Sequence, residues 1–319
     1  MANQLLSNQN IIGEEKSSPF SNKLIHKKKY KINEKIYSLT LLFSGIVVLL
    51  IIGGIVLSLL VNSAPSIFKF GAGFLTGDDW NPVNDKFGAL PFIVGTVMTG
   101  FLALIISLPF SLSISILLGE YFRSGWLSTF VKTMTELLAG IPSVIYGFWG
   151  LYFIVPLVRN LQIGVGVIPY GVGVLTASIV LAIMIIPYSA SIGREVLELV
   201  PNDLKEGAYS LGATRYEVIK KISVPYSISG ILAGVILSLG RALGETMAVT
   251  MLIGNRNVIP EGIFAPGQTI ASIIANQFNE ANNAIHVSAM IQLGLILLIM
   301  SAIINFLGKY IIKRLSVKE

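Results

Sequence analysis

The chain has 319 residues, of which 53% are hydrophobic and only 13% are charged, and its formal net charge is +6. This composition, combined with long apolar runs, is typical of a membrane protein that crosses the bilayer several times. Because there is no cysteine, disulfide bonds and thiolate metal sites are excluded.

The N-terminal segment, residues 1–35, is polar and basic. Residues 1–22 are rich in Asn and Ser, which predicts disorder. The lysines within residues 27–31 are expected to contact anionic lipid as a general anchor.

Six apolar runs predict an all-α, polytopic fold, because roughly 20 apolar residues are needed to cross a bilayer. The first run is too long for a signal peptide and has no cleavage pattern close behind it, so we expect it to be retained. Pro109, Pro142 and Pro187 fall inside runs and predict kinks or breaks. The expected spans are 36–62, 89–118, 137–158, 169–193, 226–254 and 285–309.

The first span and the outer loop that follows it make up residues 36–88. Asp78 and Asp79 lie there beside Trp80. Two adjacent carboxylates allow catalysis or cation binding, but we favour a solvated loop with an aromatic residue at the membrane interface.

The glycine pairs on either side of Pro169 do not follow a strand, so they predict turns and helix packing.

The distribution of Lys and Arg predicts the orientation. Eighteen of them lie in the N-terminal tail, in the loops after spans two and four, and in the C-terminal tail, against four on the opposite side. By the positive-inside rule, both termini and the loop after span four are expected to be cytoplasmic.

Residues 203–225 form a polar, amphipathic loop between two apolar runs. The pairs Asp203/Glu206 and Thr214/Glu217 each predict a capping box at a helix start, and Gly212 suits a left-handed helix end. The loop is therefore expected to be a helix, a glycine turn and a second helix, with an apolar face formed by Leu204, Ala208 and Leu211. A plain surface loop lying on the membrane is the alternative.

This loop resembles the "EAA" loop of ABC transporter permeases. Glu206, Gly207 and Ala208, then Gly212, then Ile222-Ser223-Val224-Pro225 match the family spacing of Glu-Ala-Ala, Gly and Ile-x-Leu-Pro. Gly207 replaces the first Ala and slightly weakens the helix, and Val224 replaces the Leu. The resemblance implies that the loop docks into a groove of an ATPase subunit, through Leu204, Glu206, Gly207, Ala208, Leu211 and Gly212.

The fifth span contains the sequence Gly240-Arg241-Ala242-Leu243-Gly244-Glu245-Thr246. Arg241 and Glu245 are four residues apart, so we expect them to share one helix face. A charge at bilayer depth costs at least roughly 2.5–3.5 kcal/mol on insertion scales, which favours a functional role. An ion pair that only fixes helix packing is the alternative, although two rows of small residues, 230/234/238 and 240/244/248, indicate a tight helix interface.

The run from Arg241 to Thr246 resembles the signature of phosphate ABC permeases. The outer-loop residues 64–91 resemble the PstC type in particular, and the similarity extends from the first span to the C-terminus. The resemblance implies a MetI-like permease core at residues 89–312, an extra N-terminal helix and a cytoplasmic tail at 313–319, in a bacterial inner membrane. It also implies three kinds of protein partner: a second permease (PstA type), an ATPase dimer (PstB type) and an external phosphate-binding protein (PstS type). Membrane lipid is a further expected partner, and nucleic acid is not expected.

The hypothesis for the mechanism places Arg241, Glu245 and Thr246 on the substrate pathway. An Arg fork suits phosphate oxygens, and an ionised Glu245 accepts a hydrogen bond from a protonated phosphate or gates Arg241. Alternating access would be driven by the ATPase.

Several motifs are absent from the sequence. There is no Gly-x-x-x-x-Gly-Lys-Ser/Thr loop, no Gly-x-Ser-x-Gly and no His-Glu-x-x-His, so we predict a pore-forming subunit and not an enzyme. ATP and Mg would be bound by the partner ATPase. His26 and His286 are distant and are expected to be ordinary surface or interface residues, and no metal site or cofactor is expected.

Three other functions remain open from sequence alone. The chain fits a permease for another oxyanion, such as sulfate, molybdate or phosphonate. An anion transporter driven by an ion gradient would need carboxylates inside spans, and only Glu245 qualifies. A membrane signalling or scaffold protein is the third.

Overall fold

The computed structural model describes residues 19–315, with side chains described for residues 34–314. The predicted disorder of residues 1–22 is wrong for residues 19–22, which are helical, whereas residues 1–18 lie outside the described residues. The tail at 316–319 and the side chains of residues 27–31 also lie outside them. The chain divides into two compact units, Met1–Ser58 and Leu59–Glu319. Within the described part of the first unit, the backbone is one helix, and almost every side chain from residue 34 onward is exposed.

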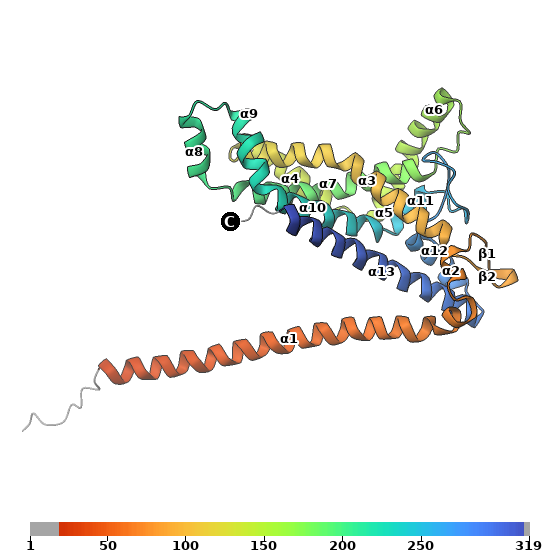
Figure 1. Ribbon diagram of the computed structural model, residues 1–319, viewed down its shortest axis with the longest axis horizontal. Helices are drawn as coiled ribbons and strands as arrows, with labels where there is room; N and C mark the ends of the chain where they lie inside the picture. The colour runs from red at the N-terminus through yellow and green to blue at the C-terminus, as the bar shows by residue number, and fades with distance from the viewer. Residues whose placement is uncertain (1–18, 316–319) are drawn as a thin grey trace, which may run out of the picture. The chain divides into compact units, whose positions relative to one another are not determined.

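The second unit is a bundle of packed helices (Figure 1). Six described helices are long and apolar enough to cross a membrane, so the all-α prediction and the number of spans are confirmed. The helices are α1 (Pro19–Phe70), α2 (Gly73–Thr76), α3 (Leu90–Ile116), α4 (Trp126–Gly140), α5 (Ser143–Trp149), α6 (Val155–Val165), α7 (Val174–Glu198), α8 (Asn202–Ser210), α9 (Arg215–Val218), α10 (Val224–Leu243), α11 (Met247–Leu252), α12 (Ile270–Gln277) and α13 (Ala284–Leu315). Two strands, β1 (Trp80–Asn81) and β2 (Lys86–Phe87), and five short helical turns, η1 (Pro82–Asn84), η2 (Leu117–Tyr121), η3 (Gly150–Ile154), η4 (Ile219–Ser223) and η5 (Phe278–Glu280), complete the elements.

Some predicted boundaries are wrong for identifiable reasons. The first span continues through residues 63–70 as helix, even though Pro65 lies inside it. Pro109 and Pro187 are likewise inside unbroken helices. Pro142 does interrupt the helix, because α4 ends at Gly140 and α5 begins at Ser143. The third span is therefore 143–165 and not 137–158.

Close packing of α3 on α7 forms the centre of the second unit. The buried residues of α3 and η2 that recur at every fourth position are small: Thr99, Ala103, Ser107, Ser111, Ser115 and Gly119. This spacing places them on one helix face, and small residues allow two backbones to approach closely. The hydroxyl of Ser115 donates to the carbonyl of Ala190 on α7 at 3.0 Å, and the hydroxyl of Ser178 on α7 donates to the carbonyl of Thr99 at 3.2 Å.

Helix α10 packs on α7 and also contacts α3. A Cβ added at Gly230 would lie 2.5 Å from Val196, and one added at Gly234 would lie 3.0 Å from Ile192. The first predicted small-residue row is therefore confirmed as a helix interface. The second row, 240/244/248, is wrong, because α10 ends at Leu243 and α11 begins at Met247.

The end of the bundle opposite α8 and α9 carries the β1–β2 hairpin (Figure 1). Trp80 is only 5% exposed and packs against Phe74, Phe87 and Phe92, and its indole Nε1 donates to Gln277 Oε1 at 2.9 Å. Trp80 is therefore a core residue at this end of the bundle, and its expected position at the membrane interface stays a prediction. Asp79 remains exposed and pairs with Lys86 at 3.3 Å, as a solvated loop requires.

We expect Gly193→Ala to destabilise the α3–α7 contact by about 1 kcal/mol or more, because its Cβ would overpack the interface. That Cβ would lie 2.4 Å from Ser115 Oγ and 3.0 Å from Ser115 Cβ. Gly164→Ala on α6 is the matched control, since a Cβ there meets nothing within 4 Å and alanine favours a helix. Thermal unfolding of the two purified variants in detergent measures the difference, and equal stability would contradict the proposed packing.

Candidate functional site

The segment between α7 and α10 folds as a helix, a glycine turn and a second helix. After α8, the N–H of Gly212 donates to the carbonyl of Tyr209 and the N–H of Ala213 to that of Ala208, which is the Schellman arrangement. Gly212 has φ +83°, a left-handed conformation that favours glycine. The predicted turn is confirmed.

The two predicted capping boxes have different outcomes. Thr214 and Glu217 form one at the start of α9. Asp203 and Glu206 do not, because α8 begins at Asn202 and its N-cap, Pro201, makes no side-chain hydrogen bond. Pro225 lies in the first turn of α10. Helix α9 continues through the π-helical turn η4 into α10.

The six predicted docking residues all belong to α8 and the turn after it. Leu204 and Leu211 are 47% and 91% exposed, Glu206, Gly207 and Gly212 are exposed, and Ala208 is half-buried. Ala208, Leu211 and Gly212 also line a hollow of about 270 Å³ between α8 and α9. An exposed leucine beside a hollow at one end of the bundle is well placed for contact with another protein.

The inner face of the same segment is fixed to the end of α3. Lys205 Nζ lies 2.6 Å from Glu120 Oε1, and both side chains are only 8% exposed. Arg215 donates to the carbonyls of Glu120 and Tyr121 at 2.6 and 3.0 Å, and its guanidinium stacks on the Tyr121 ring at 4.3 Å. Glu120 and Tyr121 belong to η2, a π-helical turn of the kind often found at functional sites. The two short helices of the predicted docking segment (residues 203–225) therefore both hold one turn at the end of α3.

The geometry of Arg241 and Glu245 differs from the prediction. Arg241 is in the last turn of α10, which ends at Leu243, so the two residues do not share a helix face. No described carboxylate lies within ion-pair distance of Arg241. Glu245 Oε1 instead accepts from the N–H of Ala248 at the start of α11, and Thr246 donates to the carbonyl of Gly244. Both Glu245 and Thr246 are half-buried in the break between the helices.

Arg241 is held by an aromatic ring. Its guanidinium carbon lies 4.3 Å from the centre of the Tyr188 ring on α7, a favourable cation–π arrangement. Arg241 and Tyr188 line a cavity of about 460 Å³ with Leu237, Gly240, Ser301 and Asn305. Tyr188 was not among the residues singled out in the sequence, because a lone tyrosine in an apolar span gives no periodic signal.

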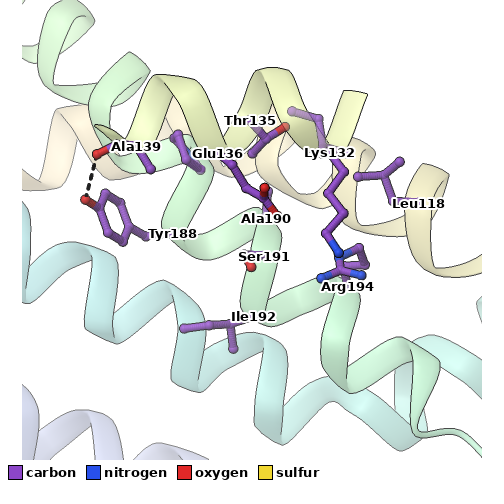
Figure 2. Close-up of a pocket in the computed structure, with 12 residues that line it drawn as sticks. Leu118, Lys132, Thr135, Glu136, Ala139, Tyr188, Ala190, Ser191, Ile192 and Arg194 are labelled. Atoms are coloured by element: carbon purple, nitrogen blue, oxygen red, sulfur yellow. Dashed lines mark hydrogen bonds between the residues drawn. The ribbon is translucent and has the colours of Figure 1, made fainter. Parts of the chain in front are cut away.

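A second cavity, of about 270 Å³, lies between α4 and α7 (Figure 2). Tyr188 borders this cavity too, and its hydroxyl donates to the carbonyl of Ala139 at 3.3 Å. Lys132 of α4 extends toward Arg194 of α7 (Figure 2), whose guanidinium is paired with Glu198 at 3.0 Å. Tyr188 therefore separates a hollow lined by Arg241 from one lined by Lys132 and Arg194.

The histidine outside the N-terminal tail is not a surface residue. His286 is 7% exposed and stacks on Phe87, which corrects the expectation of an ordinary surface or interface position. His26 lies outside the residues with described side chains. Among the described residues, no group of three or more His, Cys, Asp or Glu side chains is placed to hold a metal ion.

Comparison with known proteins identifies similar sequences and folds. Residues 111–317 match the family described as "Binding-protein-dependent transport system inner membrane component". The "Phosphate transport system permease protein PstC" of Pasteurella multocida (strain Pm70) is 43% identical over 320 aligned positions, which cover 95% of this chain and 98% of that protein.

Two solved structures show the same fold at low sequence identity. One is a bacterial alginate ABC transporter in complex with an alginate pentasaccharide-bound periplasmic protein (TM-score 0.61, 14% identity, 91% of this chain and 97% of that chain). The other is the MetNI methionine ABC transporter in inward-facing conformations (TM-score 0.52, 20% identity, 72% of this chain and 95% of that chain). The expected MetI-like permease core is confirmed.

Removal of one partner of the Glu120–Lys205 pair is expected to destabilise the protein. Lys205→Met leaves Glu120 buried and opposed only by Arg123 at 3.7 Å, so we expect a loss of about 3 kcal/mol, the lower end of the range for breaking a buried pair. The double variant Glu120→Gln/Lys205→Met, which removes both charges, should recover most of the loss. Thermal unfolding in detergent measures both, and a double variant no more stable than the single one would show that the two charges are not coupled.

Proposed function

Because this chain belongs to the family of binding-protein-dependent transport system inner membrane components, we propose that it is the permease subunit of an ATP-driven importer of inorganic phosphate. The observation that carries the proposal is the 43% identity to a PstC phosphate permease over 95% of the chain. The aligned length includes the two features that transport needs, namely the exposed docking segment and Arg241.

The docking segment is proposed to be the part of this chain that a partner ATPase moves when it hydrolyses ATP. A separate ATPase dimer of PstB type would bind ATP and Mg and grip Leu204, Leu211 and the turn at Gly212. Arg215 and Lys205 hold this segment to η2, so its movement would reach α3 as well as α10. Alternating access follows when these helices tilt between two arrangements.

Arg241 is proposed to stabilise phosphate on its way through the membrane. Phosphate carries one or two negative charges near neutral pH, and a guanidinium presents donors in a fork that suits its oxygens. Arg241 has an exposed side chain at the edge of a cavity and stacks on Tyr188, which leaves its N–H groups available. Glu245 and Thr246 lie in the adjacent helix break, from which they are proposed to line the same route.

The remaining partners and the orientation complete the proposal. A second permease of PstA type would form the other half of the pathway, and an external PstS-type protein would deliver phosphate at the end that carries the β1–β2 hairpin. Both termini and the docking segment would be cytoplasmic, as the Lys and Arg distribution predicts. The lipid-facing helix of the first unit would cross the bilayer as an addition to the core.

Three alternatives make different predictions. A permease for sulfate, molybdate or phosphonate would show competition of that anion with labelled phosphate. A gradient-driven transporter would continue after ATP depletion and stop when the ion gradient is removed. A scaffold would dock its partner and move no anion.

Replacement of Arg241 by Gln is expected to abolish phosphate uptake, because glutamine has no charge to offset that of the anion. Uptake of labelled phosphate into vesicles with the reconstituted complex, with and without ATP and the binding protein, measures the effect. Arg256→Gln is the matched control, since Arg256 is an exposed residue away from the cavity and its loss should leave uptake unchanged. Normal uptake by an assembled Arg241→Gln complex would reject the role.

Leu211→Asp is expected to release the ATPase without disturbing the fold, because this side chain is 91% exposed. Gly212→Val should act in the same direction by straining a residue at φ +83°. Co-purification of the ATPase with the permease is the measurement. Val83→Asp, at an equally exposed position (93%) on the opposite end, should keep the ATPase bound. A complex that survives Leu211→Asp intact would show that the docking assignment is wrong.

A further inference from the structure

The cavity beside Arg241 is bordered on one side by two polar residues of α13. Ser301 and Asn305 are four residues apart and line this cavity together with Arg241, Tyr188, Leu237 and Gly240. They therefore share one face of α13. The surrounding stretch, 295–308, is otherwise made of apolar residues and glycine, so two polar side chains on one face need an explanation.

Neither polar side chain is used to hold the fold. No described residue forms a hydrogen bond with the side chain of Ser301 or Asn305. The serines of α3 behave differently, because the hydroxyls of Ser111 and Ser115 each donate to the carbonyl four residues earlier. A polar group inside an apolar span without a partner in the protein costs free energy, and a bound polar ligand would offset that cost.

The amide of Asn305 lies beside the backbone of Gly240, the residue that precedes Arg241. An added Cβ at Gly240 would lie 3.8 Å from Asn305 Oδ1 and 3.9 Å from Nδ2. The amide of Asn305 therefore packs over the backbone of the residue that precedes Arg241. The Arg241 guanidinium itself stacks on the Tyr188 ring at 4.3 Å. A charged fork, an amide and a hydroxyl consequently surround one hollow of about 460 Å³.

We propose that Ser301 and Asn305 are phosphate-contacting residues that complete the anion site at Arg241. The inference rests on the proposed function and names further residues for it. The Asn305 amide donates through its NH₂ and accepts through its oxygen, and the Ser301 hydroxyl does both. These neutral groups match a phosphate that has both unprotonated oxygens and a P–OH group. The acceptor role for the phosphate proton thus belongs to Asn305 and Ser301, since Glu245 is engaged at the start of α11.

The test uses the complete reconstituted complex with saturating phosphate-loaded binding protein. Asn305→Ala and Ser301→Ala are expected to lower phosphate uptake about tenfold each, the loss that follows from removal of a hydrogen bond to a charged group. Asn305→Asp should lower it further, because a carboxylate there repels the anion and pairs with Arg241. Asn305→Gln, which keeps the amide, should restore part of the uptake.

ATP hydrolysis stimulated by the binding protein separates a substrate contact from a structural role. A substrate contact predicts that hydrolysis continues while phosphate uptake per ATP falls, whereas a packing defect would lower both. Ala302→Ser is the matched control, since it adds a hydroxyl at an exposed neighbouring position that does not line the cavity. Its uptake should be unchanged.

The outcomes distinguish this inference from the proposed function. Loss of uptake in Arg241→Gln together with unchanged uptake per ATP in Asn305→Ala, Asn305→Asp and Ser301→Ala would overturn the inference alone. Normal uptake in Arg241→Gln would overturn the pathway itself. A parallel fall of hydrolysis and uptake in the Asn305 variants would assign the residue to helix packing and reject the contact.

Discussion

The close approach of α3 to α7 determines where the other functional elements of the second unit lie. Small residues at every fourth position of α3 bring its backbone against α7, and the contact continues into η2. There, a Cβ added at Gly119 would lie 2.9 Å from Leu197 Cβ. This packing fixes the turn that carries Glu120, and Glu120 in turn holds Lys205 of the docking segment. The docking segment is therefore anchored to a helix end that is itself immobilised by its neighbour.

A single helix, α7, links this anchor to the candidate anion site. Its last turns contact η2 at Leu197, and Tyr188, further from the docking segment, stacks on Arg241. Helix α10 packs on α7 through Gly230 and Gly234 and ends at the site. A displacement of α8 and α9 would consequently reach Arg241 by two routes, along α10 directly and through α3 and α7. Close side-chain packing transmits a displacement because it deforms little.

The sequence predicted much of this structure, because several signals are local. Span number follows from apolar length, and the turn at Gly212 and the cap at Thr214 follow from residue type and spacing. The features that the sequence did not predict depend on contacts between residues that are far apart in the sequence. Nothing near Leu243 signals the end of α10, since Gly244 also fits a continuous row of small residues. The Glu120–Lys205 pair joins residues 85 positions apart, and no periodicity relates them. Tyr188 and Asn305 acquire their significance only when α7, α10 and α13 are brought together.

The break after α10 matters for the chemistry because it prevents Arg241 from forming an ion pair with Glu245. On one continuous helix face, Glu245 would be a natural ion-pair partner at the fourth position, and a paired guanidinium attracts an anion weakly. In the structure the carboxylate turns to the N–H of Ala248 and the guanidinium lies on an aromatic face. A cation–π contact orients the guanidinium without cancelling its charge. The arrangement therefore leaves a cation that is fixed in place and still able to bind an anion.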